Sequence, residues 1–409
     1  MSALAAVIPV LLGVLCAQLA LGVMNPLVPL LLVAHGTATP EIGLIASAYS
    51  MGFMAGAVTA DRLVIRIGHI RAFAAFAAMA ANATLLMSVI GDPIVWAALR
   101  ALIGYSVAGV FLVAESWLNG QADNASRGRI FGAYLVASWG GGAVGALALN
   151  VAPPSPVLFV AAGIALTTAL LPLALTRQAN PAIGRQARMG LLMLYRISPV
   201  GLACCLTAGL VNGAFYALSP VYLSDFAIPA AGVAVFIAAA NVAGLAVQWP
   251  LGLLSDRVGR RPMAMALLAL ALLTALAFAL LGRLGMPALL ALGCVFAAVT
   301  APLYGLGAGQ TNDRLERGDA VAASGGLLFA WAVGATIGPA LAGGVMGLLG
   351  PQGLFVYLAA VLAGISGFTL LRIRAREEVS RDQRGSFVPA RTEPAVLSEL
   401  DTPAGEGRG

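Results

Sequence analysis

Charged side chains are rare in this chain, so each one that interrupts an apolar stretch is a candidate for ionic or proton-transfer chemistry. Of the 409 residues, 60% are hydrophobic and only 10% are charged. Arg100 and Glu115 fall within one apolar stretch, residues 94–118. A charge in such surroundings costs roughly 2.5–3.5 kcal/mol unless it faces a cavity or a partner. The two residues lie about 22 Å apart along a helix, so they cannot pair with each other.

These two charges therefore have separate candidate roles. Arg100 is a candidate for proton-linked control or for contact with a solute. Arg100 lies near the start of the apolar stretch, so the alternative is that its side chain extends to the nearer membrane surface. Glu115 is a candidate proton carrier, and an ion pair with Arg66, Arg127 or Arg129 is the structural alternative.

A second group of charges lies in the segment Gly-Leu-Leu-Ser-Asp-Arg-Val-Gly-Arg-Arg, residues 252–261, between two apolar runs. Gly259 permits a tight turn, and Asp256 can pair with arginines at neighbouring helix ends. A partial copy lies 191 positions earlier around Gly68, with Ile65 in place of the aspartate and Asp61 one helical turn before it. The alternative is that these charges only set membrane topology.

Other chemistry is not indicated. The four cysteines have no metal-ligand spacing, the two histidines fall in different predicted loops, and no Gly-x-x-x-x-Gly-Lys phosphate loop occurs. No catalytic pair is within reach, so we expect no enzyme activity, metal or cofactor. The net charge of +6 comes from scattered arginines, and we expect no nucleic-acid partner.

Long apolar runs must position these residues. A soluble domain has roughly 25% charged residues, whereas lipid accepts apolar side chains and forces the backbone into helices or closed barrels. Stretches of about 20 apolar residues cross a bilayer. The sequence predicts an all-α polytopic membrane protein with twelve such helices, at residues 7–33, 42–63, 72–90, 94–118, 130–151, 157–175, 199–223, 233–254, 263–281, 287–307, 320–349 and 353–371.

Arginine placement predicts the orientation, because cytoplasmic loops retain Lys and Arg. The chain has no lysine, and with a cytoplasmic amino terminus nearly all loop arginines lie inside, while the other side keeps Arg283. Both termini are then cytoplasmic, in the inner (plasma) membrane of the cell. The first stretch lacks a basic start and is too long for a cleaved signal, so it is expected to be a retained helix.

Internal repetition divides the chain. Several short motifs recur with offsets of 189–193 residues, including Leu27-Val28-Pro29 as Leu218-Ser219-Pro220. We expect two six-helix bundles at residues 1–176 and 199–371, joined by a cytoplasmic linker at 177–198 and followed by a disordered cytoplasmic tail at 372–409. Within the linker, residues 189–197 are either an ordinary basic loop or a short amphipathic helix on the membrane surface.

These motifs resemble the major facilitator superfamily, whose loop signature matches residues 252–261. Segments such as Val113-Ala-Glu-Ser116 and Gln248-Trp249-Pro250 resemble its YcaD-type branch. The resemblance implies two pseudo-symmetric bundles, alternating access and a solute site between the halves. It assigns gating to the residues of the hairpin and its copy: Gly252, Asp256, Arg257, Gly259, Arg260, Arg261, Asp61, Arg66 and Gly68. Arg100 and Gly104 match its second motif.

Polar and aromatic residues within the predicted helices are candidate solute contacts: Gln18, Asn25, Tyr49, Phe111, Tyr134, Trp139, Asn212, Tyr216, Asn241, Gln248, Tyr304 and Trp331. This mostly uncharged set favours a small neutral organic solute, with a vitamin-like heteroaromatic such as riboflavin as an example. We expect a monomeric secondary transporter that favours uptake, with protons as a candidate coupling ion.

Two alternatives remain. One is a proton-coupled exporter of drugs or metabolites, although the glycine-rich motif of drug antiporters is incomplete because Ala146 follows Gly145 where proline belongs. The other is a transporter-like membrane sensor that binds a solute without moving it.

Overall fold

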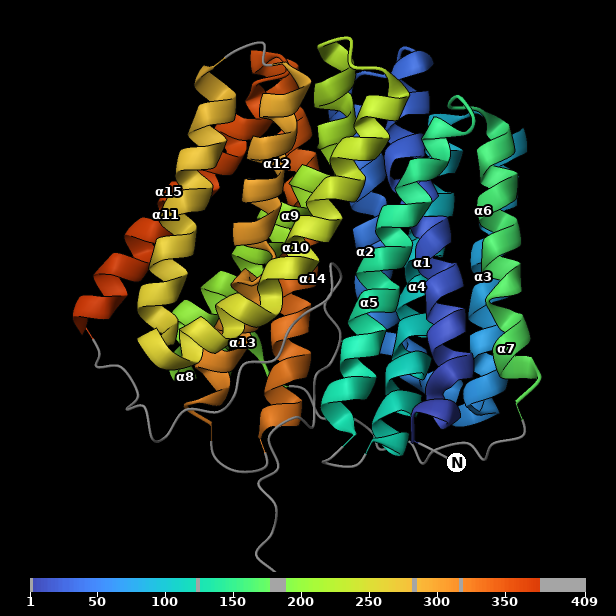
Figure 1. The fold of residues 1–409 in the computed structure, drawn as a ribbon, viewed down its shortest axis with the longest axis horizontal. Coiled ribbons are helices and arrows are strands. Elements are labelled where there is room, and N and C mark those ends of the chain that lie inside the picture. The colour runs from blue at the N-terminus through green and yellow to red at the C-terminus, as the bar shows by residue number, and fades with distance from the viewer. Residues whose placement is uncertain (1–2, 123–125, 177–188, 282–284, 316–318, 376–409) are drawn as a thin grey trace, which may run out of the picture.

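The chain folds into a bundle of long helices. A computed structural model describes residues 3–122, 126–176, 189–281, 285–315 and 319–375 (Figure 1). Every regular element in these ranges is helical. The predicted tail lies outside the described residues from 376 onward, and so do residues 177–188 of the predicted linker.

Two helical bundles stand side by side (Figure 1), and each accounts for six of the twelve candidate membrane spans of the described residues. The first contains α1 (Ala3–Ala34), α2 (Thr39–Ile67), α3 (His69–Val89), α4 (Pro93–Gln121), α5 (Arg127–Ala146) with the 3-10 turn η1 (Leu147–Asn150), α6 (Pro156–Thr168) and α7 (Leu170–Ala174). The second contains α9 (Pro199–Asp225), α10 (Ala230–Val258), α11 (Arg260–Leu280), α12 (Met286–Thr300), α13 (Leu303–Asn312), α14 (Ala320–Leu349) and α15 (Gly353–Ala375). The short helix α8 (Leu191–Ile197) precedes the second bundle.

Twelve helical segments of the described chain are long and apolar enough to span a membrane, as predicted. The sixth span combines α6 with α7, and the tenth combines α12 with α13. The tenth reaches Asn312, five residues beyond the predicted end. His69 was expected in a loop but begins α3 and is buried.

The two bundles repeat the same helix pairings. In the first, α1 packs on α5, α2 on α4 and α3 on α6. In the second, the corresponding pairs are α9 with α14, α10 with α12, and α11 with α15. Between the bundles, α2 packs on α14 and α5 packs on α10. These two contacts are equivalent, because α2 corresponds to α10 and α5 corresponds to α14. The repeated helix pairings therefore agree with the internal repetition of sequence motifs.

Small residues set the closest helix approaches. A Cβ atom added at Gly145 of α5 would lie 2.2 Å from the carbonyl oxygen of Leu19 in α1. Nothing larger than glycine fits that crossing without moving a helix. The glycine spacing that partly matches drug antiporters therefore has a packing role within the first bundle.

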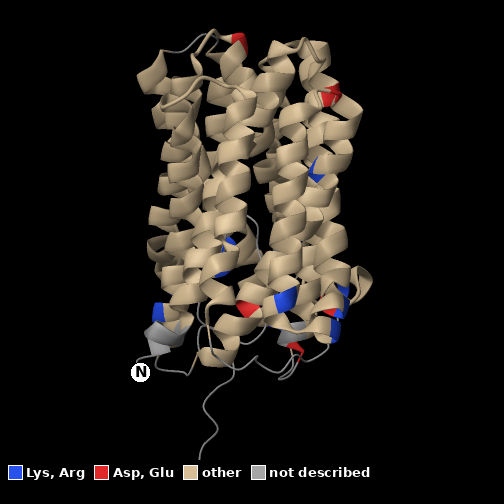
Figure 2. Ribbon diagram, turned by 90° about the vertical axis from the view of Figure 1, so that its right-hand side faces the viewer, with Lys and Arg blue, Asp and Glu red and all other residues tan. Residues whose placement is uncertain are grey.

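The two ends of the bundle differ in the number of arginines that they carry (Figure 2). We call the end that carries the chain's amino terminus, with Arg66, Arg71 and Arg257, the amino-terminal face. The other end, where α2, α4 and α10 begin, is the opposite face. Most of the coloured arginines lie toward the amino-terminal face, where Arg66, Arg71 and Arg257 are all exposed.

Candidate functional site

A cavity of about 110 Å³ lies between the two bundles, with walls from seven of the long helices. This volume holds several water molecules. From the first bundle, α1, α2, α4 and α5 contribute side chains. From the second, α9, α10 and α14 contribute. The polar and aromatic lining residues are Gln18, Asn25, Tyr49, Ser50, Arg100, Ser138, Asn212, Tyr216, Asn241 and Trp331.

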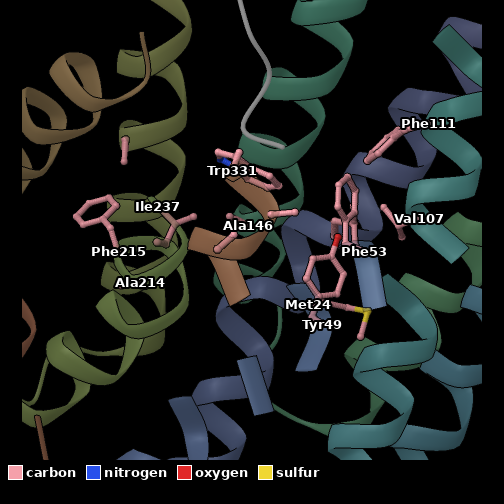
Figure 3. Packing of buried hydrophobic residues seen from close by; sticks show 14 of the residues in the cluster. Met24, Tyr49, Phe53, Val107, Phe111, Ala146, Ala214, Phe215, Ile237 and Trp331 are labelled. Carbon is pink, nitrogen blue, oxygen red and sulfur yellow. The ribbon is translucent and has the colours of Figure 1, made fainter. Parts of the chain in front are cut away.

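Seven of the twelve predicted contact residues line this cavity: Gln18, Asn25, Tyr49, Asn212, Tyr216, Asn241 and Trp331. The Asn212 amide donates to the carbonyl of Thr300, 3.4 Å away, which fixes its orientation in the wall. Trp331 and Phe53 meet edge to face across the two bundles, with ring centroids 5.9 Å apart (Figure 3). Aromatic rings therefore join the bundles at the level of the cavity.

The other five predicted contacts lie elsewhere. Phe111 is buried within the first bundle near Val107 (Figure 3). Trp139 packs against α10, where a Cβ at Gly244 would lie 2.8 Å from its ring. Tyr134 bonds to Glu115, while Gln248 and Tyr304 are buried without lining the cavity.

Ser50 and Ser138 line the cavity but were not predicted. Serine in a helix commonly bonds to its own backbone, so its presence in a span gives no sequence signal for a binding site.

Arg100 also lines the cavity. Its side chain is only 6% exposed, and its guanidinium carbon lies 4.4 Å from the ring centroid of Tyr49. This arrangement answers the question left open by the sequence, because the guanidinium turns toward a ring on α2 and not toward the outer surface. The lining residues include no Asp or Glu. The cavity wall thus carries one cation beside amide groups and aromatic rings.

Glu115 lies in a separate buried position, nearer the amino-terminal face. It is 7% exposed, and the hydroxyl of Tyr134 donates to its Oε1 atom. Tyr304 of the second bundle is close enough for an electrostatic interaction with it. Two of its three predicted arginine partners, Arg66 and Arg129, have exposed side chains. The structure thus gives Glu115 a phenol partner from the next helix that the sequence did not indicate.

The cavity is closed toward the opposite face by close packing of α2 on α14. A Cβ at Gly43 would lie 2.4 Å from the carbonyl oxygen of Pro339. A Cβ at Gly343 would lie 3.1 Å from the α-carbon of Gly43, and one at Gly347 would lie 2.7 Å from the ring of Pro40. The two backbones touch here, which leaves no passage between these helices.

The predicted hairpin joins α10 to α11 at the amino-terminal face. Gly259 forms the turn with a φ of 116°, a conformation that side chains other than glycine rarely adopt. Arg260 Nε lies 2.6 Å from Asp313 Oδ2, and a second nitrogen lies 3.7 Å from Asp256. The Arg260 and Asp313 side chains are 3% and 5% exposed.

The hairpin charges thus fasten α10 and α11 to the end of α13, all within the second bundle. A Cβ at Gly309 would lie 2.3 Å from the Arg260 guanidinium, so glycine makes room for it. Gly252 and Arg261 are buried, whereas Arg257 is exposed. Asp313 was not among the predicted gating residues. It lies beyond the motif, and only the folded arrangement shows that it is the closest carboxylate to Arg260.

The copy in the first bundle keeps Arg66 at the position of Arg257 but lacks the residues of the ion pair. Gly68 again forms the turn, with a φ of 83°, and Ile65 is 46% exposed where the second bundle has Asp256. His69, which matches Arg260 at the same offset of 191, lies 2.9 Å from the Ser116 hydroxyl through Nε2. Asp61 accepts the backbone N–H of Arg62 at 2.9 Å. A histidine–serine hydrogen bond stands where the second bundle has an ion pair.

Metal chemistry finds no support in the described ranges, which contain no group of three or more His, Cys, Asp or Glu side chains suited to a metal ion. The cysteines are all unbridged, and Cys204 and Cys205 are buried.

Two bundles that enclose a central cavity, twelve apolar spans and a charged hairpin at one face define a helical membrane transporter. A profile of the Major Facilitator Superfamily matches residues 10–312 and 237–402. The chain belongs to this superfamily.

Similar curated proteins are described as MFS-type transporters. The chain is 29% identical over 361 residues to an uncharacterised MFS-type transporter of Enterobacter sp. (strain 638), covering 86% of this chain and 93% of the relative. It is 29% identical over 361 residues to the uncharacterised MFS-type transporter YcaD of Salmonella enteritidis PT4 (strain P125109), covering 85% and 91%. The resemblance to the YcaD branch is thus confirmed, and the protein is an MFS transporter.

Solved structures share the fold at low sequence identity. The nucleoside transporter NupG (D323A mutant) has a TM-score of 0.78 at 11% identity, over 90% of this chain and 100% of that one. A bacterial homolog of the human lysosomal transporter Spinster, in an inward-facing and unoccupied conformation, has a TM-score of 0.74 at 14% identity, over 94% and 98%. These comparisons support the fold, and bacterial relatives support an inner-membrane location.

Proposed function

We propose that this protein is a secondary transporter that moves a small organic solute by alternating access of the central cavity. The observation that carries the proposal is that both bundles line one cavity while α2 and α14 close it at the opposite face. A site shared by two bundles changes its exposure when one bundle rocks against the other. Binding and release at different faces then follow from the same residues.

The amino-terminal face is proposed to be cytoplasmic. Exposed Arg66, Arg71 and Arg129 lie on it, and cytoplasmic segments retain arginine. In that orientation the glycine contacts of α2 and α14 close the outer side, as an inward-facing state requires. The inward-facing Spinster homolog is similar in fold.

The cavity chemistry indicates which kind of solute fits. Tyr49, Tyr216 and Trp331 offer aromatic faces, while the amides of Asn25 and Asn241 offer donors and acceptors. Arg100 adds a fixed positive charge beside Tyr49. We therefore propose a flat or partly apolar solute that carries a negatively charged or acceptor-rich group.

This solute differs from the neutral one expected from the sequence, because that expectation left the orientation of Arg100 open. Neither riboflavin nor an uptake direction finds support in the cavity or in the relatives, so neither is part of the proposal.

Glu115 is proposed to carry the coupling proton. A carboxyl group this buried within a membrane span is costly, which makes a functional role the default interpretation. Its bond to the Tyr134 hydroxyl holds it on the amino-terminal side of the cavity. Protonation there removes a buried charge, and loss of the proton restores it, so the two states of the carboxyl group can favour different arrangements of the bundles.

A binding and exchange experiment tests the solute proposal. Purified protein is screened by thermal shift against organic acids, nucleosides, peptides and neutral vitamins, because a ligand of the native state raises its melting temperature. Counterflow in proteoliposomes then tests the best ligand. Arg100→Gln should weaken its binding at least about tenfold, whereas Arg129→Gln, an exposed arginine on the amino-terminal face, should leave binding unchanged. Binding without counterflow in either direction would support a sensor and contradict transport.

A second experiment tests the coupling proposal. In proteoliposomes with a proton gradient, Glu115→Gln should abolish solute accumulation while solute exchange continues. Glu41→Gln, at an exposed carboxylate near the start of α2, is the matched control and should retain accumulation. Accumulation that survives in Glu115→Gln would exclude Glu115 as the carrier.

A further inference from the structure

Two side-chain amides in the wall of the central cavity stand apart from the other polar groups there. Gln18 of α1 is 8% exposed and Asn241 of α10 is 7% exposed, and both line the cavity. Among the described residues, neither side chain makes a hydrogen bond or an ion pair. The Asn212 amide differs, since it donates to the carbonyl of Thr300 at 3.4 Å. A buried amide without a partner lowers stability, so solute binding accounts for these two amides better than packing does.

Both amides lie against α5, where the first bundle meets α10 of the second. A Cβ added at Gly141 would lie 2.9 Å from the Cβ of Gln18, and one added at Gly142 would lie 3.9 Å from the amide nitrogen of Asn241. Gly142 also lines the cavity, so the lack of a side chain there leaves space in front of the Asn241 amide. Ser138 lines the cavity one helical turn earlier on the same face of α5. This side of the cavity is therefore neutral and rich in hydrogen-bonding groups.

The cationic and aromatic residues lie on the other side of the cavity. The contact of α2 with α14 and the contact of α5 with α10 are equivalent in the two bundles. An axis along the membrane normal relates such bundles, which places the two contacts on opposite sides of the cavity. Tyr49 of α2 lies 4.4 Å from the Arg100 guanidinium, and Trp331 of α14 meets Phe53 of α2 at 5.9 Å. The cavity thus has a cationic, aromatic side and an amide side.

The chemistry of an amide indicates which group fits the second side. A side-chain amide carries a carbonyl acceptor beside two N–H donors, whereas a carboxylate offers acceptors only. A solute that enters also displaces water from these amides, and its affinity falls when it cannot replace the lost hydrogen bonds. An N–H group next to a C=O group, as in a carboxamide, a lactam or an imide, can both donate to and accept from the two amides.

We propose that the solute is a flat carboxylate that carries an amide-like group at the end opposite to its carboxylate. The carboxylate lies beside Arg100 and Tyr49, and the amide-like group pairs with Gln18 and Asn241. On the basis of the transport function proposed above, these two amides then set the specificity of the solute site. Because Gln18 belongs to the first bundle and Asn241 to the second, such a solute contacts both bundles at once.

Calorimetric titration of the purified full-length protein tests the solute class. The first probe, 4-carbamoylbenzoate, has both groups on one ring, whereas benzoate lacks the amide and benzamide lacks the carboxylate. The first should bind at least about tenfold more tightly than either of the others. Orotate, a pyrimidine carboxylate with an imide edge opposite to its carboxylate, is a second probe with both groups. If neither 4-carbamoylbenzoate nor orotate binds more tightly than benzoate, the proposal is overturned.

Replacement of one amide tests its role. Asn241→Leu keeps the size of the side chain, and the affinity for 4-carbamoylbenzoate should fall about tenfold while the affinity for benzoate stays unchanged. Without ligand the melting temperature should stay the same or rise, because no hydrogen bond within the protein is lost. A lower melting temperature, or an equal loss of benzoate binding, would show a structural role and contradict the proposal. Asn82→Leu, at an exposed amide of α3, is the control and should change neither affinity.

A pair of glycine variants locates the amide-like group of the solute. Gly142→Ala fills the space in front of Asn241 and should weaken 4-carbamoylbenzoate at least about fivefold more than benzoate. Gly140→Ala adds the same methyl group to α5, where a Cβ meets no atom within 4 Å, and should weaken neither probe. Equal effects of Gly142→Ala on both probes would place the amide-like group elsewhere and overturn the assignment. These titrations need no transport, so a failure of counterflow contradicts the transporter function without changing the binding result.

Discussion

Gly43→Ala should open the contact that closes the solute cavity at the opposite face. The added Cβ would lie 2.4 Å from the carbonyl oxygen of Pro339 and 3.2 Å from the α-carbon of Gly343. Ordinary contacts begin near 3.4 Å, so α2 and α14 must separate by about 1 Å to admit the methyl group. Both obstructing atoms belong to the backbone, and no rotamer change can relieve the overlap.

The energetic consequence falls on one conformation. Overpacking at a tight contact costs about 1–3 kcal/mol, and this cost applies only while α2 and α14 are closed. A cost of that size changes the ratio of the two states by about 5- to 150-fold. Gly43→Ala should thus raise the fraction of protein whose cavity is reachable from the opposite face.

Thiol labelling measures this fraction. Asn25→Cys places a thiol in the cavity wall, in a background where the half-buried Cys16 and Cys294 are replaced by alanine. A membrane-impermeant reagent added to intact cells should label it at least about fivefold faster in Gly43→Ala than in the parent.

Gly344→Ala is the matched control, since a Cβ at Gly344 meets no atom within 4 Å. It adds the same methyl group to α14 without touching α2. If Gly43→Ala and Gly344→Ala label at the same rate, the glycine contact does not control access and the reasoning is refuted.

Two further predictions concern the hairpin. Asp313→Asn should destabilise the protein by about 3–5 kcal/mol in a denaturant titration, because it leaves the buried Arg260 guanidinium without its nearest carboxylate. A double replacement by Met and Leu at these two positions should recover much of that loss, and no recovery would mean that the pair is not the cause. Asp256→Asn should lower the melting temperature more than Asp61→Asn, because Asp256 lies 3.7 Å from the buried Arg260 whereas Asp61 accepts a neighbouring backbone N–H. Equal shifts would show that Asp61 replaces the missing acid of the first bundle.

The helices could be predicted from the sequence because the length of an apolar run is a one-dimensional property. A span of about 20 residues is needed to cross the hydrocarbon, and the described part of the chain contains twelve helices of that kind. The ends were less predictable. The tenth span continues to Asn312 through polar residues such as Gln310 and Thr311, which are buried against other helices.

Side-chain partners depend on helix rotation, which no single segment reveals. Arg100 had two open alternatives until α2 was seen to present Tyr49 to it at 4.4 Å. For Glu115, charge alone pointed to arginines, whereas the rotation of α5 brings the Tyr134 hydroxyl to the carboxylate. Residue type thus identified candidate positions, and the packing of neighbouring helices decided which of them share a site.

The hairpin pair and the glycine contact have different consequences for the transport cycle. Arg260 and Asp313 both belong to the second bundle, so their ion pair is carried along when that bundle moves as a rigid body. It stabilises the bundle in either state and does not by itself distinguish the states. Gly43 and Pro339 belong to different bundles, and their contact exists only while the opposite face is closed. Loss of Asp313 should therefore lower stability with little effect on cavity labelling, whereas Gly43→Ala should change labelling with a smaller effect on stability.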